Sequence, residues 1–329
     1  MISTEVTVLT VVYVVTMLVA FIGNTLLIYI VWKKPDVRSL TSAMFVNMAV
    51  ADLLVTLVVM PYSVAHLHTG GKWLIVKGLA GEITCRAVFF VGMLSITASI
   101  ICLTSMALDR CVAVVYPLRR LQWFRKPKFL VPLIWILSSA LMSICLVITD
   151  FNPETAMCEY NFRILPGDVP QAIRGIFIYL FIVNYLIPLS ATSILYAKTA
   201  HTLWFRQVPG HRYSQSRRQQ EITKRRVVRM LIIVVTAFAL CWLPGQVYQL
   251  IRAVTAWANN FPALVMILCY WLGHANSAFN PWLYILLSKR LNTALTRMAR
   301  RRFSRESTGS LKTKTIKITA HGAMAEACL

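Results

Sequence analysis

Long runs of apolar residues, separated by short polar segments, make up most of this chain. A helix of about 20 apolar residues is long enough to cross the hydrocarbon core of a lipid bilayer. The chain contains seven such runs, and we predict a membrane-spanning helix in each of them. Their approximate bounds are 6–32, 40–66, 84–115, 129–149, 173–203, 223–254 and 262–287. The predicted fold class is therefore an all-α membrane protein, a seven-transmembrane helix bundle.

Composition and charge narrow the class and indicate an orientation. Apolar residues are 57% of the chain and charged residues 14%, which excludes a large water-soluble domain. If the amino terminus lies outside the cell, 28 of the 34 lysines and arginines fall on the inner side, as membrane proteins commonly show. This predicts a multi-pass plasma-membrane protein with an extracellular amino terminus and a cytoplasmic carboxyl terminus. Nucleic acid is then not needed as a partner to explain the net charge of +22.

Polar segments flank the seven runs. Residues 289–302 place Leu291, Leu295 and Met298 at helical spacing among basic residues, which predicts a short amphipathic cytoplasmic helix after the seventh span. Residues 1–302 then form one domain, and residues 303–329 are predicted to be a disordered cytoplasmic tail. About five residues precede the first run, so the amino terminus is expected to be short or truncated.

Two of the cysteines fall on the extracellular side of this topology. Cys85 begins the third span, and Cys158 lies in the loop after the fourth span. Disulfides form in the oxidising environment outside the cell. We therefore predict a Cys85–Cys158 disulfide that holds the loop over the mouth of the bundle.

Polar residues inside the spans mark a candidate binding site. Asp52 is the only acidic residue in the middle of a span. At comparable depth on other spans lie Asn24, Ser95, Ser99, Asn276, Ser277 and Asn280. A carboxylate among hydroxyls and amides suits a small cation such as Na⁺ or a water cluster, because a lone buried acid needs compensation. The alternative is plain hydrogen bonding between helices.

Pro188, Pro244 and Pro281 lie inside spans. Each removes one backbone hydrogen bond and kinks its helix, which allows segments to swing about defined points. Proline is also common in membrane helices in general, so this pattern alone does not establish a moving part.

Several short motifs occur in order along the spans. They are Gly23-Asn24, Asn47-Met48-Ala49-Val50-Ala51-Asp52, Asp109-Arg110-Cys111, Trp135, Pro188 with Tyr196, Phe238, Cys241-Trp242-Leu243-Pro244, Asn276-Ser277 and Asn280-Pro281-Trp282-Leu283-Tyr284. Together they resemble the rhodopsin-like (class A) G-protein-coupled receptors over about Val6–Arg302. The resemblance implies a receptor rather than an enzyme, with no cofactor beyond an allosteric Na⁺.

The resemblance also implies roles for matching positions. The Na⁺ or water site would be Asp52, Asn24, Ser99, Asn276 and Asn280. The activation switch would be Trp242, Phe238, Pro188, Ile100, Pro244, Pro281, Tyr284 and Tyr196. Asp109 and Arg110 would couple to a heterotrimeric G protein.

Two further features of the sequence concern regulation. Lys224 stands where many members of the family carry an acid that restrains Arg110, so we expect no such ionic latch and a raised ligand-free activity. Serines and threonines in the basic tail suit receptor kinases, and their phosphorylation would recruit arrestin-like partners. An ordinary soluble tail is the alternative.

The ligand class is narrowed by departures from other receptors. Biogenic amine receptors carry an Asp where this chain has Gly92, and opsins carry the retinal lysine where it has His274. The expected ligand-binding residues are Gln246, Gln249, Tyr248, Trp271, His274, Gly92, Met93 and Glu159. Loop acids Asp150, Glu154, Glu159 and Asp168 above this polar and aromatic mouth suit a neuropeptide with basic residues, unless they only solvate the surface.

The alternatives to a peptide receptor are a small-molecule receptor, a channel or transporter, and a membrane enzyme. A receptor of the same fold for a non-peptide small molecule remains open. A channel or transporter would show repeated short segments or rows of charge inside the membrane, and the sequence has neither. A membrane enzyme would need a catalytic constellation such as H-E-x-x-H, which is also missing from the sequence.

Overall fold

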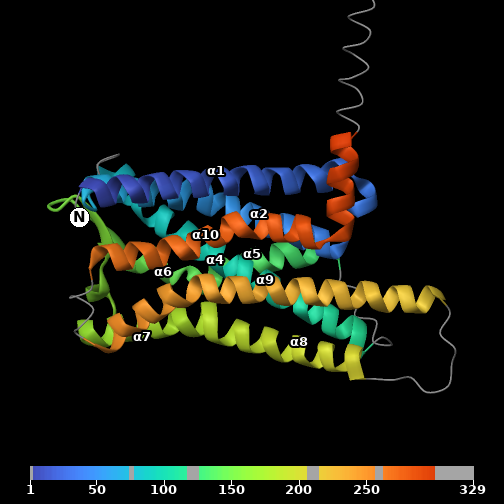
Figure 1. Ribbon diagram of the computed structural model, residues 1–329. Helices are drawn as coiled ribbons and strands as arrows, with labels where there is room; N and C mark the ends of the chain where they lie inside the picture. The colour runs from blue at the N-terminus through green and yellow to red at the C-terminus, as the bar shows by residue number, and fades with distance from the viewer. Residues whose placement is uncertain (1–2, 74–77, 117–125, 206–214, 256–261, 301–329) are drawn as a thin grey trace, which may run out of the picture.

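The computed structural model describes residues 3–73, 78–116, 126–205, 215–255 and 262–300, and this part of the chain forms an elongated helix bundle (Figure 1). The predicted fold class is confirmed. The tail, residues 303–329, lies outside the described residues.

The long helices match the predicted spans closely. The first four spans are α1 (Ser3–Lys33), α2 with α3 (Leu40–Leu54 and Met60–Thr69), α4 (Gly78–Val115) and α5 with α6 (Pro127–Met142 and Ile144–Ile148). The last three are α7 with α8 (Val169–Phe181 and Ile187–Phe205), α9 (Gln215–Val254) and α10 (Ala263–Leu287). Short 3₁₀ turns lie at Pro35–Val37 and Phe162–Ile164.

Two spans contain a π-helical turn that the sequence analysis did not predict. One turn, Val55–Val59, joins α2 to α3 just before Pro61, and the other, Ile182–Leu186, joins α7 to α8 just before Pro188. A proline cannot donate the backbone hydrogen bond of a regular helix, and a π turn accommodates the break by widening the helix locally. The kink predicted at Pro188 therefore begins one turn earlier, inside the π segment.

A β-hairpin closes one end of the bundle. Strands β1 (Thr149–Asn152) and β2 (Met157–Tyr160) pair antiparallel, with Phe151 opposite Cys158. We call this the hairpin end. The other end, which carries Arg110 near the last turns of α4, is the Arg110 end. Cys85 and Arg110 are 25 residues apart on α4, or about 37 Å along the helix axis, so the two ends are separated by the thickness of a membrane.

A further helix, residues 289–300, follows Ser288 and runs across the Arg110 end (Figure 1). Leu291 and Ala294 on this helix are buried against the bundle core, and Leu295 and Met298 pack beside them. Its basic residues lie on the remaining faces, as Lys289, Arg290, Arg297 and Arg300 are exposed. The helix is therefore amphipathic, with its apolar stripe turned inward.

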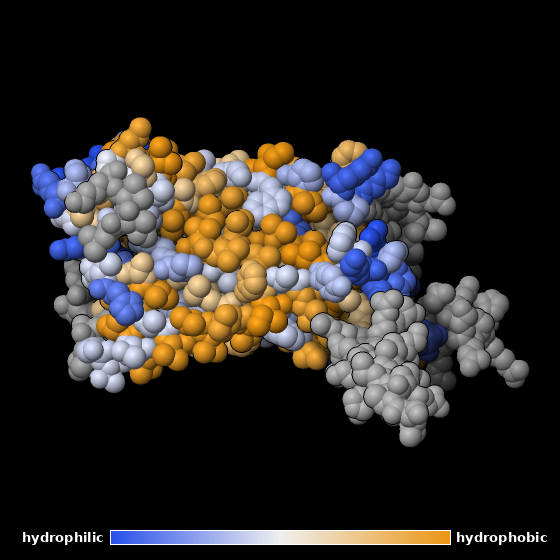
Figure 2. All heavy atoms as spheres, turned by 90° about the horizontal axis from the view of Figure 1, so that it is seen from above, coloured by the Kyte–Doolittle hydropathy of each residue, from blue (hydrophilic) through white to orange (hydrophobic). Residues whose placement is uncertain are grey.

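An apolar belt surrounds the middle of the bundle. Figure 2 shows hydrophobic residues across the central surface and hydrophilic residues at the two ends. On α1, Val8, Val11, Leu18 and Ile22 are each more than half exposed. Such side chains are stable in contact with lipid rather than water, and the belt therefore fits a hydrocarbon environment.

Within the described ranges, six helical segments are long and apolar enough to cross a membrane. α10 has the length as well, because its 25 residues extend about 37 Å. Its hydropathy is lower because it carries His274, Asn276 and Asn280, all of which are buried inside the bundle. Polar side chains in a membrane helix normally face the bundle interior, so α10 is the seventh span.

The bundle closes where α1 packs against α10. Gly23 permits this close approach, since a Cβ atom there would lie 2.7 Å from Pro281 Cγ and 2.9 Å from Trp282 Nε1. The proline ring is fixed to the backbone and cannot move aside. Small residues are the usual means by which membrane helices come this close.

We predict that Gly23→Ala lowers the melting temperature of the purified protein by several degrees, because overpacking a tight contact costs about 1–3 kcal/mol. Gly175→Ala is the matched control, since a Cβ atom there meets nothing within 4 Å. The control adds the same methyl group and should leave the melting temperature unchanged or raise it. Equal behaviour of the two variants would show that the α1–α10 contact is not tight.

Candidate functional site

A cavity opens beneath the β-hairpin, with a volume of about 320 Å³. Its walls come from α1, α3, α4, α7, α9 and α10, and Cys158 and Tyr160 of β2 cover it. Pockets of about 300–1,000 Å³ with mostly apolar walls and a few polar groups are typical ligand sites. The cavity therefore has the size and lining of a binding site for a small molecule or a short peptide segment.

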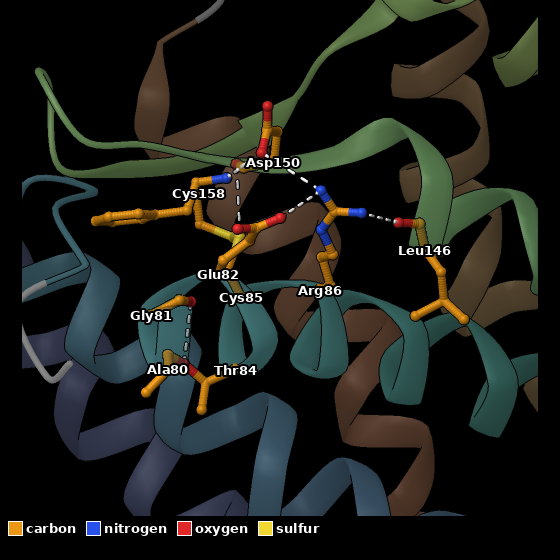
Figure 3. Close-up of a disulfide and its surroundings, with 10 residues drawn as sticks. Ala80, Gly81, Glu82, Thr84, Cys85, Arg86, Leu146, Asp150 and Cys158 are labelled. Carbon is orange, nitrogen blue, oxygen red and sulfur yellow. Dashed lines mark hydrogen bonds and ion pairs between the residues drawn. A yellow bond between two sulfur atoms is a disulfide. The ribbon is translucent and has the colours of Figure 1, made fainter. Parts of the chain in front are cut away.

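The disulfide attaches the hairpin to the bundle. Cys85 on α4 and Cys158 on β2 are bonded, with their Cα atoms 5.7 Å apart, which confirms the predicted pair. Arg86 strengthens the attachment: its guanidinium lies 2.7 Å from Glu82 Oε1 and 3.6 Å from Asp150 Oδ1, and it donates to the Leu146 carbonyl at 3.1 Å (Figure 3). The hairpin is thus held in place over the cavity.

Five of the eight predicted ligand-binding residues line this cavity. They are Gly92 and Met93 on α4, Gln246 and Gln249 on α9, and His274 on α10. These positions lie on three different spans, and the bundle brings them together around one cavity. The sequence analysis therefore located part of the cavity's lining.

The other three predicted ligand-binding residues do not line the cavity. Trp271 points toward α1, where its Nε1 donates to Thr16 Oγ1 at 3.1 Å. Tyr248 packs edge-on against Tyr270, with ring centroids 6.1 Å apart. Glu159 is exposed on β2, because successive side chains of a strand point to opposite faces and Cys158 points into the bundle.

Three of the four loop acids have partners within the protein. Asp150 lies beside Arg86, and Asp168 caps α7 by accepting from the Gln171 backbone N–H at 3.0 Å. Glu159 accepts from Asn152 Nδ2 at 3.3 Å, and Glu154 is exposed in the turn. The sequence analysis expected these four acids to face a ligand. In the structure none of them lines the cavity.

Phe89 and Tyr160, which the sequence analysis did not assign to the site, form one aromatic wall of the cavity together with Tyr62. Phe89 packs edge-on against Tyr160 at 5.2 Å and against Tyr62 at 5.7 Å between ring centroids. Burial raises the pKa of the Tyr160 hydroxyl well above its ordinary value, so this group stays neutral and can donate a hydrogen bond. A signal was available for Tyr160, because it lies two residues after Cys158 and therefore on the same face of the strand.

Trp242 forms part of the cavity's inner wall and connects it to the core. Its ring lies 6.2 Å from that of Phe238 and, edge-on, 6.2 Å from that of His274. Gly273 leaves room for the indole, since a Cβ atom there would be 2.8 Å from two of its ring carbons. The Trp242 side chain is thus positioned by α10 as well as by its own helix.

The remaining residues of the predicted switch are buried or lie at helix kinks. Ile100, Phe238 and Tyr196 belong to the central core cluster, together with Trp242 and Tyr284. Pro188 follows the π turn in the fifth span, and Pro244 and Pro281 lie inside α9 and α10. The structure therefore gathers the predicted switch around the packed core of the bundle.

Asp52 lies inside the bundle and is 3% exposed. Asn280 Nδ2 donates to its carboxylate at 3.1 Å. Asn24 also reaches across helices, where its Nδ2 donates to the Ser277 carbonyl at 3.0 Å. The predicted polar residues on α1, α2 and α10 are therefore joined by hydrogen bonds, and Ser99 and Asn276 are buried as well.

The oxygen atoms of this cluster suit a small cation. Within the described part of the chain, Oδ1 of Asn24, Asn276 and Asn280 and Oγ of Ser95 are buried without a hydrogen-bond partner. Each such acceptor is costly to bury unsatisfied, and a hard cation takes carboxylate, amide and hydroxyl oxygens as ligands. The oxygen atoms around Asp52 are therefore suitable ligands for Na⁺, and they are also suitable partners for ordered water.

At the Arg110 end, Arg110 is held by neighbours on two helices. Its guanidinium lies 3.0 Å from Asp109 Oδ2 and donates a hydrogen bond to Thr41 Oγ1. Lys224 is exposed, and among the described residues Asp109 is the one acid that forms an ion pair with Arg110.

Two tyrosines lie between Asp52 and Arg110. Tyr284 is fully buried, stacks on Phe45 at 4.3 Å between ring centroids, and donates to Met48 Sδ at 3.4 Å. The Tyr196 hydroxyl is buried and has no hydrogen-bond partner within the ranges that the structure describes. A buried hydroxyl without a partner favours a second arrangement in which it finds one.

A sequence model of the seven-transmembrane receptor (rhodopsin) family matches residues 23–284 of this chain. The chain is 28% identical over 323 residues to a QRFP-like peptide receptor of Branchiostoma floridae, covering 94% of this chain and 82% of that one.

Two mammalian proteins are similar as well. Galanin receptor type 2 of Mus musculus is 31% identical over 279 residues, which are 83% of this chain and 70% of that receptor. Neuromedin-K receptor of Cavia porcellus is 30% identical over 295 residues, which are 86% of this chain. The chain spans 62% of the neuromedin-K receptor, less than two thirds of its length.

We predict that Cys85→Ser and Cys158→Ser each lower the melting temperature, and that the double variant is no worse than either single one. Both changes break the same bond, which spans 73 residues and stabilises by about 2–5 kcal/mol. Cys269→Ser is the control, because Cys269 is a free thiol. Additive losses in the double variant would mean that the two cysteines act separately.

Proposed function

This chain belongs to the rhodopsin family of seven-transmembrane receptors, and on that premise we propose that it binds an extracellular neuropeptide and activates heterotrimeric G proteins. The observation that carries the proposal is the cavity of about 320 Å³ that opens at the hairpin end and reaches Trp242. Similar proteins that are named as peptide receptors support the ligand class.

Membership in the family means that the protein is a multi-pass receptor of the plasma membrane rather than an enzyme. We propose that the hairpin end faces outward, which also places the amino terminus outside. The disulfide at that end supports this orientation, since disulfides persist outside the cell. The basic residues of the opposite end support it too, by the positive-inside rule.

The ligand would act through Trp242. Its indole borders the cavity on one side and contacts Phe238 of the core cluster on the other. Pro244 lies two residues further along α9, so the kink and the indole move together. A ligand that fits one arrangement of these helices better than another shifts the population toward it, by no more than its difference in affinity.

The G protein would bind at the Arg110 end. In the described arrangement Arg110 is held by Asp109 and Thr41, while the buried Tyr196 hydroxyl has no partner within the described residues. Release of Arg110 toward Tyr196 would satisfy that hydroxyl and expose a cation to the partner. Receptor kinases and arrestin-like proteins are proposed partners of the tail, and the lipid membrane surrounds the belt.

Na⁺ is proposed as an allosteric ligand at Asp52. Asn24, Ser99, Asn276 and Asn280 complete the site, and the unpartnered amide oxygens support it. A cation bound there would hold α1, α2, α4 and α10 in one arrangement, because its ligands come from all four helices.

The function is tested by expressing the chain with a promiscuous G-protein α subunit and applying a neuropeptide library while second messengers are recorded. We expect at least one peptide to give a response, and Arg110→Ala to abolish the response while peptide affinity changes less than about threefold. Arg297→Ala is the matched control, since it removes an exposed cation at the same end.

Three other results would contradict the proposal. Ion currents without a G protein would indicate a channel. A response only to non-peptide compounds would indicate a small-molecule receptor of the same fold. Loss of peptide binding together with signalling in Arg110→Ala would mean that Arg110 supports the fold rather than coupling.

We predict that Asp52→Asn removes the effect of Na⁺ on agonist affinity. Exchanging NaCl for an organic chloride salt should raise agonist affinity of the unmodified receptor about fivefold or more, as expected for a coupling of at least about 1 kcal/mol. Asp36→Asn serves as control, because Asp36 is an exposed acid outside the spans. An unchanged salt response in Asp52→Asn would exclude Asp52 as the cation ligand.

A further inference from the structure

The charges around the cavity favour one kind of ligand. Among the described residues that line it, Arg252 carries a guanidinium group and none is an aspartate or glutamate. The residues that follow Arg252, 253–262, contain no acidic side chain in the sequence either. The cavity is therefore positive at its mouth, which disfavours a ligand that enters with a basic group.

The acids near this end do not neutralise Arg252. Glu82 and Asp150 lie against Arg86 at 2.7 and 3.6 Å. Asp168 and Glu159 have the hydrogen-bond partners described above, and Glu154 is exposed in the hairpin turn. In the part of the chain that the structure describes, Arg252 is exposed and forms no ion pair, so its guanidinium is open to an acceptor on a ligand.

Aromatic rings hold the Arg252 guanidinium in place. Its central carbon lies 5.5 Å from the centre of the Phe177 ring and 6.0 Å from that of Tyr248. Guanidinium groups pack favourably over aromatic faces and keep their edge N–H donors free for a planar acceptor. A carboxylate is the acceptor that matches this geometry, because it accepts two parallel hydrogen bonds.

Two glutamines continue inward from Arg252. Gln246, Gln249 and Arg252 follow one another at intervals of three on α9 and all line the cavity. Residues three apart share one helix face and rise about 4.5 Å per step. Gln246 and Gln249 are 6% and 7% exposed, and Gln246 Oε1 is buried without a hydrogen-bond partner in the described residues.

We call Gln246, Gln249 and Arg252 the ladder. Its side chains are suited to bind the end of a peptide ligand. Primary amides both donate and accept, so they pair with the backbone amides of an extended ligand, and the unpartnered Gln246 Oε1 requires a donor. A peptide backbone supplies such donors at about 3.3 Å per residue, so the two steps of about 4.5 Å from Gln246 to Arg252 span about three residues of an extended peptide. The Arg252 guanidinium then binds the acceptor group at the outer end of that peptide segment.

We infer that the ligand presents a carboxylate to Arg252 and backbone amides to Gln249 and Gln246, so that the segment entering the cavity is acidic or neutral rather than basic. The inference rests on the proposed peptide receptor function and replaces the basic peptide that the loop acids suggested. The carboxylate can be a carboxyl terminus or an Asp or Glu side chain, and the two sources are separated by experiment.

The probes are three pools of N-acetylated tetrapeptides with the same aromatic and aliphatic positions. The first pool has a free carboxyl terminus and no charged side chain, the second is amidated with one Asp or Glu, and the third is amidated with one Lys or Arg. Binding is measured as the rise in melting temperature of the full chain in lipid nanodiscs.

We expect the first or second pool to stabilise the protein more than the third, and the better of these two identifies the source of the carboxylate. Arg252→Ala should weaken the binding of that pool by about tenfold or more, the usual effect of losing a hydrogen bond to a charged group. Arg252→Glu should reverse the preference toward the third pool. Arg163→Ala is the control, since Arg163 is exposed at the same end and does not line the cavity.

Gln246→Leu provides a second measurement that does not involve charge. It should weaken the binding of all pools alike, because it removes an amide contact and leaves Arg252 in place. Preference for the third pool, or a preference that Arg252→Ala does not alter, would overturn the inference while leaving the receptor a peptide receptor. If no pool and no library peptide binds, the proposed function fails and the inference fails with it.

Discussion

A polar group inside the hydrocarbon needs a partner in the protein or a bound ion or water, and this constraint governs the bundle. Asp52 meets Asn280, Asn24 reaches the Ser277 carbonyl, and Trp135 Nε1 donates to Asn47 Oδ1 at 2.8 Å. Each bond joins two spans. Because an unpartnered polar group in lipid costs several kcal/mol, hydrogen bonds of this kind between spans set the rotation of the helices that they join. The apolar belt alone would allow many rotations.

Two features at the hairpin end depend on that rotation. The disulfide from Cys85 to Cys158 places β2 over the cavity only because α4 presents Cys85 toward the bundle mouth. α9 likewise presents Trp242 and the ladder that ends at Arg252 to the same space. The site that receives a ligand and the core that responds to it are therefore built from the same helix faces, so a contact at the mouth is close to the packing that must change.

Particular residues show where sequence reasoning succeeded and where it stopped. The spans, the disulfide and the inner wall at Gly92, Gln246 and His274 could be predicted, because length, hydropathy and topology restrict them strongly. The π turn at Val55–Val59 could not, since apolar side chains look alike in α and π turns. The partners of the loop acids could not be predicted either, since Arg86, which lies beside Asp150, is far from it in sequence.

The sequence by itself determined that the chain crosses a membrane, how often it does so, and which polar residues must lie inside, because the bilayer leaves few alternatives for a backbone or a charge. Only the tertiary structure decided which side chains share the cavity. Trp271 and Tyr248 lie on the right helices at the right depth, but helix rotation turns them toward α1 and Tyr270. That rotation follows from packing and hydrogen bonds between spans that are distant in sequence. It therefore cannot be predicted from the sequence of any one span.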